Sequence, residues 1–492
     1  MDLVNHLALG FATAFSLSNL LWCLAGVTLG TIVGVLPGLG PFAAISILLP
    51  ITYHLDPIAG IIMLAGIYYG TQYGGSTTSI LLNLPGESAS VITTLDGYQM
   101  AKNGQAGIAL SISAIGSFVA GIIATLFIAS MAIPLSMIAT KFGPAEYTSL
   151  MVLGLIAAVV LSRGSIFKSS SMVMVGILLG TIGVDINSGI ERFTFGIPNL
   201  YDGISFVIIA VGMFGLSEII YNVLHTKEVK VTKPNLKELY PSRQDLKTAF
   251  PPIIRGSLLG SFLGMLPGAG SVISSFASYT VEKNISKTPE RFGKGAIEGV
   301  AGPESANNAG AQTGFIPMLS LGIPTTPVMA LMMAALLIHD IQPGPSTITE
   351  NPTLFWGLIV SMLIGNFFLV ILNLPLVGIW VSILRIPRKF LYPVITGFCF
   401  VGAYYVSNSF FNVLLLIPFG LLGYLFKRWG CPPAPLAMGF VVGSALEEYL
   451  RRALMISNGS WMTFVEHPIS LTLLTISTIL VIYFSLRRKN DT

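Results

Sequence analysis

The chain has 492 residues, of which 53% are hydrophobic and only 10% are charged, and its mean hydropathy is +0.78. Soluble domains carry about 25% charged residues, so this composition excludes a soluble globular protein and predicts a polytopic membrane protein. The net charge of +4 is small. No basic stripe is interleaved with aromatic residues, so a nucleic-acid-binding function is not supported.

The N-terminal segment MDLVNH lacks the basic region of a signal peptide, so we expect the first apolar segment to remain in the mature protein. Spanning a bilayer takes about 20 apolar residues. Candidate spans follow at 106–136, 144–162, 165–185, 204–222, 353–374, 390–407, 408–426, 432–447 and 466–486. The regions 22–95 and 251–340 are also apolar, but glycine, proline and amide residues interrupt them. The predicted fold class is all-α, with about 10–12 membrane segments.

Basic residues gather in a few short segments rather than along the whole chain. They lie in 227–247, 283–294, 385–389, 427–428 and 487–489. Such clusters mark cytoplasmic loops under the positive-inside rule. The segment 225–250 is a long polar linker, which we expect to be cytoplasmic. It divides the chain into an N-terminal membrane repeat, 1–224, and a C-terminal membrane repeat, 251–492.

Similar phrases recur in the same order in these two parts. GVLPGLG begins at Gly34 and GMLPGAG at Gly264, an offset of 230 (264 − 34), while GTQYG at Gly70 and GAQTG at Gly310 differ by 240 (310 − 70). Further matches are Leu84-Pro85 with Ile323-Pro324, at 239, and Pro144 and Gly154 with Pro387 and Gly397, at 243. Slowly drifting offsets between similar phrases indicate an internal duplication.

The charges of matching loops predict how the two halves are oriented. The loop at 282–294 has four basic residues, whereas its counterpart near 54–60 has none. The loop at 96–105 contains Lys102, and its counterpart near 339–352 has no basic residue. Matching loops therefore alternate in charge, with Lys141 as an exception. This pattern favours inverted-topology repeats, which place a transport site at the interface of the repeats.

The phrases LPGLGP at 36–41 and LPGAG at 266–270 place helix-breaking residues inside apolar runs. Proline removes a backbone donor, and glycine permits the positive φ angles of a tight turn. At membrane depth, broken backbone is tolerated only where protein buries it or where it lines a wet cavity. A single copy would fit a simple kink. Two copies at matching positions favour discontinuous helices or re-entrant hairpins.

Two longer phrases, 66–88 and 298–327, bring amides and hydroxyls into apolar surroundings. These groups need partners away from water, which either close helix packing or a ligand site would supply. Glu304 indicates function if it lies at membrane depth, but it could instead belong to a cytoplasmic loop. The same alternatives apply to Glu87 and Asp96. No arginine lies in either phrase, so we expect helix N-termini, hydroxyls and amides to hold an anion, and backbone carbonyls to hold a cation such as Na⁺.

Catalytic motifs are absent from the sequence. The five histidines and three cysteines are dispersed without metal-ligand spacing. Neither a GxSxG nor a Walker A phrase occurs. We therefore expect no enzymatic activity, no metal site, and no cofactor apart from a coupling cation.

Several phrases closely resemble the large membrane subunit of the tripartite tricarboxylate transporters, the TctA family. They are GVLPGLGP, YYGTQYGGSTTSILLNLPGE, DGYQMAKNGQAG, GPESANNAGAQTGFIPMLSLGIPTTP and RFTFGIPNLYDG. The resemblance covers nearly the whole chain. It implies a permease of the bacterial inner membrane that takes up citrate or other carboxylates with a Na⁺ or H⁺ gradient. Its implied partners are a small TctB-like membrane subunit and a periplasmic TctC-like solute-binding protein.

The resemblance also implies a translocation site that draws on both halves. The matching residues are Pro37, Gly38, Gly40, Gln72, Gly74, Gly75, Ser76, Thr77, Pro267, Gly268, Gly270, Asn307, Asn308, Pro324 and Thr325. We expect alternating access at this site, with the binding protein delivering the substrate. Alternatives that remain open are a stand-alone ion-coupled carboxylate transporter, a channel, and an intramembrane enzyme acting on a lipid.

Overall fold

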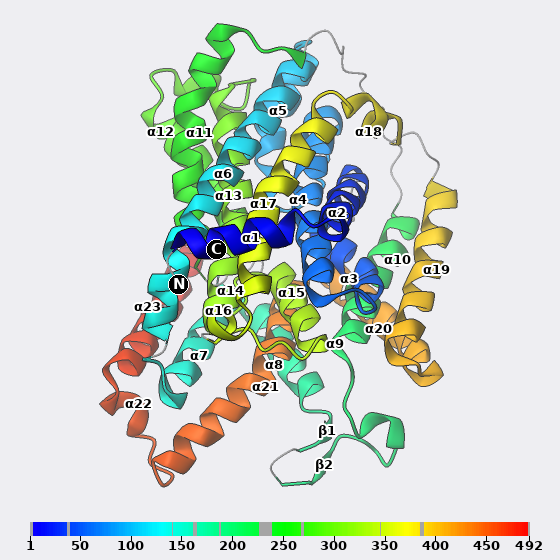
Figure 1. The fold of residues 1–492 in the computed structure, drawn as a ribbon, viewed down its shortest axis with the longest axis vertical. Helices are drawn as coiled ribbons and strands as arrows, with labels where there is room; N and C mark the ends of the chain where they lie inside the picture. Colours follow the sequence, from blue (N-terminus) through cyan, green and yellow to red (C-terminus); the bar gives the residue numbers. More distant parts are fainter. Residues whose placement is uncertain are drawn as a thin grey trace.

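The computed structural model describes residues 3–36, 40–139, 141–160, 165–185, 188–225, 239–266, 270–344, 346–383 and 388–490. Most of these residues are helical (Figure 1). Two short strands, β1 (Gly183–Val184) and β2 (Glu191–Arg192), form an antiparallel hairpin. The predicted all-α class is therefore confirmed for the described residues. Pro37, Gly38, Pro267, Gly268 and Pro387, all named above, lie outside them.

Five helices in the described part of the chain are long and apolar enough to cross a membrane. They span Leu17–Val35, Ala106–Met131, Phe206–Leu224, Pro352–Asn373 and Phe410–Arg428. Four of these coincide with predicted spans. Most of the other predicted spans correspond to shorter apolar helices, such as Pro144–Val160 and Pro468–Phe484.

The helices fall into two groups that each mix both halves of the sequence. The first, which we call the core group, contains α1 (Leu3–Ala14), α2 (Leu17–Val35), α3 (Gly40–Thr52), α4 (Pro57–Leu82), α5 (Thr93–Lys102), α6 (Ala106–Ala139), α11 (Arg243–Gly264), α12 (Gly270–Ile285), α13 (Glu298–Thr313), α14 (Phe315–Leu321), α15 (Pro327–Ile338), α16 (Thr347–Glu350), α17 (Pro352–Asn373) and α18 (Val377–Ile383). Within it, α13 packs against α11, α12 and α6, and α17 packs against α1, α4 and α6.

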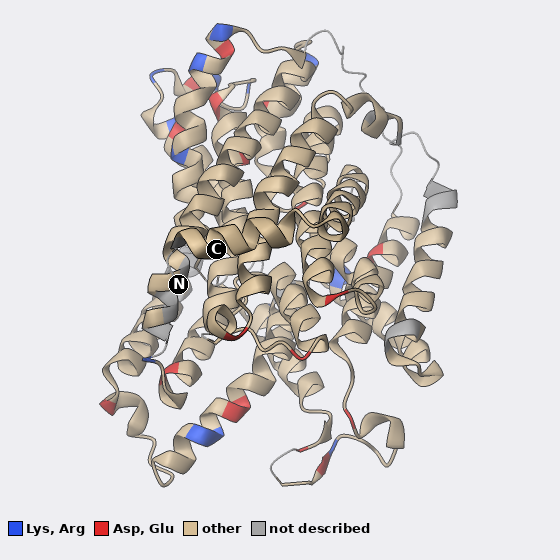
Figure 2. Ribbon diagram, in the orientation of Figure 1, with Lys and Arg blue, Asp and Glu red and all other residues tan. Residues whose placement is uncertain are grey.

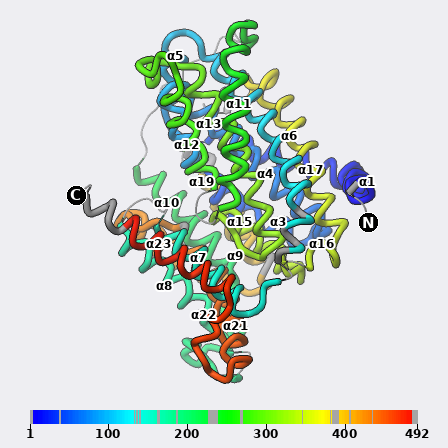
Figure 3. The backbone as a smooth tube through the Cα atoms, turned by 90° about the vertical axis from the view of Figure 1, so that its left-hand side faces the viewer, coloured from blue at the N-terminus to red at the C-terminus, as the bar shows by residue number. Residues whose placement is uncertain are grey.

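The second, which we call the side group, contains α7 (Pro144–Val160), α8 (Ile166–Gly180), α9 (Phe206–Ala210), the π-helical turn Val211–Leu216, α10 (Ser217–Leu224), α19 (Arg388–Ser407), α20 (Phe410–Arg428), α21 (Pro433–Ile456), α22 (Thr463–Glu466) and α23 (Pro468–Asn490). Helix α21 packs against α7 and α8, and α20 packs against the π-helical turn. Contacts of α3 with the π-helical turn and of α15 with α21 join the two groups. Figure 3 shows α11–α13 at one end of the molecule and α21 and α22 at the other.

The division at 225–250 stays a prediction. Residues 226–238 are not described, and α11 begins at Arg243, inside the predicted linker. Both signs of charge occur at the end of the molecule formed by α5, α11 and α12 and at the end near α21 and the hairpin (Figure 2).

Glycine stripes bring two helix pairs into very close contact. On α2, a Cβ at Gly26 would lie 2.3 Å from the carbonyl oxygen of Met63 on α4, and Gly30 and Gly34 face the next two turns in the same way. On α11, the stripe Gly256, Gly260 and Gly264 faces α13 at 2.3, 2.4 and 2.4 Å. Small residues at every fourth position allow such backbone contact. The two helix pairs are thus packed alike.

The predicted breaks also occur at matching places. Helix α2 ends at Val35 and α3 begins at Gly40, where φ is +52°; α11 ends at Gly264 and α12 begins at Gly270, where φ is +48°. A second helix end in each half is also left-handed: Asn83 follows α4 with φ 56°, and Gly322 follows α14 with φ 68°. Left-handed backbone is strained for most residues but not for glycine, which explains why both halves have glycine at the start of the helix after the first break, Gly40 and Gly270.

Candidate functional site

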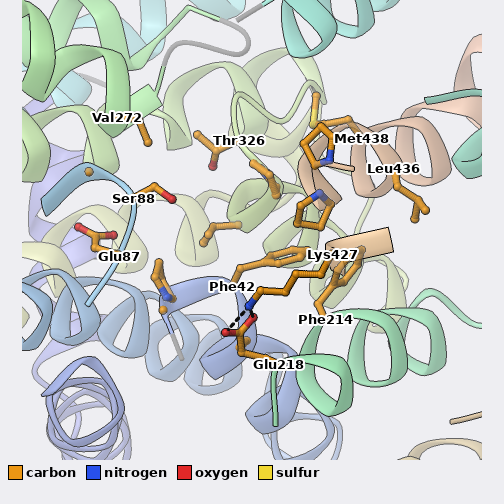
Figure 4. Close-up of a pocket in the computed structure, with 18 of the residues that line it drawn as sticks. Phe42, Glu87, Ser88, Phe214, Glu218, Val272, Thr326, Lys427, Leu436 and Met438 are labelled. Carbon is orange, nitrogen blue, oxygen red and sulfur yellow. Dashed lines mark hydrogen bonds and ion pairs between the residues drawn. The ribbon is translucent and has the colours of Figure 1, made fainter. Parts of the chain in front are cut away.

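A cavity of about 630 Å³ lies where the core group meets the side group. Helices α3, α12 and α15 all begin at its wall, through Gly40, Ser271 and Pro327. The first turn of a helix presents unpaired backbone N–H groups and a partial positive charge. Three such ends meeting at one cavity make a polar wall without a basic side chain, and the remaining wall is largely apolar (Figure 4).

The helix starts have chemical reasons in the sequence. At α15, Thr326 caps the helix, because its hydroxyl accepts from the backbone N–H of Met329 at 3.2 Å, and Pro327 occupies the first turn. Thr325 lines the same wall, is 1% exposed, and its hydroxyl has no hydrogen-bond partner among the described residues. A buried hydroxyl without a partner on a residue that lines a cavity is a group that a ligand could satisfy.

The Glu87 cluster consists of Glu87, Gln72 and Asn307. Glu87 lines the cavity from the loop after α4, and Asn307 Nδ2 on α13 donates to its Oε1 at 2.8 Å. With the amide nitrogen of Gln72 turned toward Glu87, it donates to Oε2 at 2.6 Å. Side-chain amides therefore surround this carboxylate. No basic side chain pairs with it in the described ranges.

The Glu304 cluster lies deeper, on α13, and joins four helices. Glu304 is fully buried and accepts hydrogen bonds from Ser76 on α4, Thr93 on α5 and Ser113 on α6, the last at 3.1 Å. The alternative that Glu304 lies in a cytoplasmic loop is therefore wrong. Every partner is a hydroxyl, which can donate to a carboxylate or accept from a carboxylic acid.

Ser76 shows how the hydroxyls around Glu304 could serve either protonation state of this acid. Its Oγ lies 3.0 Å from the carbonyl oxygen of Gln72 and is also hydrogen-bonded to Glu304. A single hydroxyl proton cannot serve both acceptors at once. If Ser76 donates to Gln72, then Glu304 must carry the proton; if Ser76 donates to Glu304, the carboxylate is ionised. The Glu304 cluster is thus compatible with both protonation states.

The remaining predicted residues support the site from behind. Gly74 packs against α2, and Gly75 packs against Glu87. Thr77 donates to a backbone carbonyl one turn earlier at 3.4 Å, and Asn308 donates to Ser117 at 2.7 Å. Pro324 is buried in the turn before Thr325. Among the predicted site residues that the structure describes, Gly40 and Thr325 line the cavity directly, and Gly270 begins the helix whose first turn does so.

Two residues at the cavity were not among those predicted. Lys427, at the end of α20, forms an ion pair with Glu218 of α10 at 2.5 Å, and both line the cavity. Lys427 was predicted to mark a cytoplasmic loop, which stays a prediction. It lies in the last turn of α20, before the short connection at 429–432, and its side chain also reaches the cavity wall. The useful sequence signal was an acid, Glu218, placed just after a strongly apolar run.

Asp96 ties the two halves of the chain together beside this site. It is fully buried on α5, and its Oδ1 accepts from the backbone N–H groups of Gly293, Gly295 and Ala296, each at 2.8 Å. Tyr279 on α12 donates to its Oδ2 at 2.9 Å. No group of three or more histidine, cysteine or acidic residues that could hold a metal occurs in the part of the chain that the structure describes.

Comparison with known proteins agrees with the motifs quoted above. The model of the Tripartite tricarboxylate transporter TctA family matches residues 20–438. An "Uncharacterized 52.8 kDa protein in TAR-I ttuC' 3'region" of Agrobacterium vitis is 54% identical over 494 residues, covering 100% of this chain and 98% of that protein. An "Uncharacterized protein in TAR-II ttuC' 3'region" of the same organism is 57% identical over 235 residues, covering 47% of this chain and 97% of that protein.

No solved structure matches the chain. The family match nevertheless covers most of the sequence, including both glycine stripes and every residue of the two buried acid clusters. The chain belongs to the TctA family of tripartite tricarboxylate transporters.

Proposed function

We propose that the chain is the permease subunit of a binding-protein-dependent secondary transporter. It imports tricarboxylates or related organic acids, driven by a Na⁺ or H⁺ gradient, through alternating access. The main support is the convergence of three helix N-termini, at α3, α12 and α15, on one cavity beside the unpartnered hydroxyl of Thr325. Helix N-termini bind anions through backbone N–H groups and the helix dipole.

The two buried acids support coupling to a cation. Glu87 and Glu304 lack a basic partner among the described residues, although uncompensated charge is costly away from water. A bound Na⁺ would neutralise Glu87, and the amides of Gln72 and Asn307, which donate N–H to this carboxylate in the structure, would then turn their oxygens toward the cation. Protonation would neutralise Glu304. Either event removes a negative charge close to the cavity and so favours binding of an anionic substrate there.

The repeated architecture supports alternating access. The glycine stripes and the left-handed helix starts recur in both halves at matching positions. With the alternating loop charges, this recurrence supports inverted repeats with discontinuous helices in the bacterial inner membrane. The cavity lies between the core group and the side group, so movement of one against the other would expose it to each side in turn.

The proposal includes two partners, a small TctB-like membrane subunit and a periplasmic TctC-like solute-binding protein, as the family implies. The test reconstitutes the chain with both partners in vesicles and measures uptake of labelled citrate, malate and succinate under imposed Na⁺ or H⁺ gradients. We expect gradient-dependent accumulation that requires the binding protein. Accumulation with the chain alone would favour a stand-alone carrier. No accumulation of any carboxylate under either gradient would contradict the proposal.

A matched pair of variants tests the location of the site. Thr325→Ala removes the unpartnered hydroxyl at the cavity, whereas Ser320→Ala removes another fully buried unpartnered hydroxyl, on α14 and outside the cavity lining. We expect Thr325→Ala to lower uptake and Thr325→Ser to restore it, with Ser320→Ala near wild type. Equal effects of the two alanine variants would argue against a site at this wall.

A further inference from the structure

The proposed function leaves one charged pair of the cavity wall unused. Lys427 Nζ lies 2.6 and 2.5 Å from the two carboxylate oxygens of Glu218, and 4.1 Å from the centre of the Tyr221 ring. The side chains of Lys427 and Glu218 keep 35% and 19% of their exposure. The pair is therefore reachable from the cavity and is not locked inside the protein.

The pair lies opposite the polar wall. Figure 4 shows Glu87, Ser88 and Thr326 on one side of the cavity and Lys427, Glu218 and Phe214 on the other. Lys427 is the one basic residue among the described residues that line it. The polar wall belongs to the core group, whereas α10 and α20 belong to the side group. A ligand that contacts both walls would therefore bridge the two groups.

The chemistry of the pair suggests a ligand for it. A lysine that has already given up part of its hydration to bind one carboxylate can exchange it for another and stay paired, while Glu218 keeps 19% of its exposure and the Asn222 amide, which donates to it at 3.2 Å. A substrate carboxylate held at the helix N-termini leaves the opposite wall free. A second carboxylate on the same molecule could then replace Glu218 as the partner of Lys427.

We propose that Lys427 is a second anion subsite of this cavity, which binds the distal carboxylate of a di- or tricarboxylate, and that Glu218 is its resident competitor. This inference rests on the proposed function. It makes a prediction with opposite signs: loss of Lys427 weakens binding of a dicarboxylate, whereas loss of the Glu218 charge strengthens it. A merely structural ion pair would make both losses harmful.

The test uses the complete transporter in vesicles and compares each acid with its monoamide, in which a neutral amide of similar shape replaces one carboxylate. The pairs are succinate with succinamate, malate with malamate, and citrate with its monoamide. We expect Lys427→Met to raise KM for the transported acid about tenfold or more, and to change KM for its monoamide far less. Glu218→Gln should lower KM for the acid. Lys168→Met, which removes a cation bonded to Trp429 outside the cavity lining, is the control.

A double variant, Lys427→Met with Glu218→Gln, removes both charges and leaves neither unpaired, so it covers the case in which Lys427→Met alone fails to fold. It should also lose the preference for the acid over the monoamide. The inference is overturned if these variants keep that preference, if Glu218→Gln raises KM for both compounds alike, or if the wild type transports only monocarboxylates. A wild type that transports no carboxylate at all would instead contradict the proposed function.

Discussion

Asp96 allows a quantitative prediction about how the halves of the chain are held together. Its carboxylate accepts three backbone N–H groups, from Gly293, Gly295 and Ala296, and the hydroxyl of Tyr279. The loop that donates these N–H groups leads directly into α13. Asp96 therefore fixes the start of α13, the helix that carries Glu304 of one cluster and Asn307 of the other.

The magnitude follows from the number and kind of bonds lost. Hydrogen bonds to a charged group contribute roughly 1.5–3 kcal/mol each, but water can replace the partner of a half-exposed N–H. Asp96→Ala should therefore lower the free energy of unfolding by about 3–5 kcal/mol. Asp96→Asn keeps an oxygen for the three N–H groups, and the Tyr279 hydroxyl can turn to accept from the new amide, so it should cost about 1–2 kcal/mol. Tyr279→Phe loses a single bond, worth about 1 kcal/mol.

The assay is thermal unfolding of the purified protein in detergent, with Glu350→Ala, an exposed acid on α16, as the control. We expect the melting temperature to fall most for Asp96→Ala, less for Asp96→Asn and Tyr279→Phe, and not for the control. Equal melting temperatures for Asp96→Ala and the wild type would refute the reasoning. So would an Asp96→Asn variant as unstable as Asp96→Ala, because the charge alone would then carry the effect.

Three further expectations follow from the packing and from the Glu87 cluster. Gly30→Val and Gly260→Val should each lower the melting temperature, because a Cβ would lie 2.3 or 2.4 Å from a backbone oxygen of the facing helix. Overpacking of this kind costs about 1–3 kcal/mol of stability. The control Gly397→Ala, at a position with open space around it, should leave the melting temperature unchanged. Asn307→Ala should reduce uptake while leaving the protein in the membrane, and uptake at the wild-type rate would exclude Asn307 from the site. Glu87→Gln should abolish the response of uptake to an imposed cation gradient but preserve exchange of internal for external substrate, and an unchanged gradient response would rule out Glu87 as a coupling group.

The sequence predicted the broken helices well because the signals there are local. Proline and glycine act on the backbone of their own and adjacent residues, so the ends of α2 at Val35 and α11 at Gly264 were readable from the phrases themselves. The glycine stripes before each phrase are also visible in the sequence, as small residues at every fourth position. They predict a close helix contact at each stripe but do not identify α4 and α13 as the partners.

The acid clusters could not be predicted in the same way, because their members are far apart in the sequence. Ser76 and Thr93 reach Glu304 across 228 and 211 positions. Which face of each helix points inward depends on packing against other helices, and a hydrophobic pattern that is apolar on all sides does not specify that face. The contact of Lys427 with the cavity was not predicted for the same reason. A basic residue at a helix end can mark a loop, but its position does not say which way its side chain points.

The predicted duplication offers an explanation of how one cavity could serve two ions of opposite charge in the proposed transporter. In the match of Pro85 with Pro324, Glu87 of the first half corresponds in sequence to Thr326 of the second half, at the same offset of 239 (326 − 87). At this pair of positions one half carries a carboxylate surrounded by amides, and the other carries the capping hydroxyl of a helix N-terminus. Two identical copies would have given a symmetric site for like charges. In the proposed transporter, divergence at one matched position would give a single wall of the cavity both a group for a cation, at Glu87, and a helix N-terminus for an anion, at Thr326, which is the arrangement that coupled transport of a carboxylate requires.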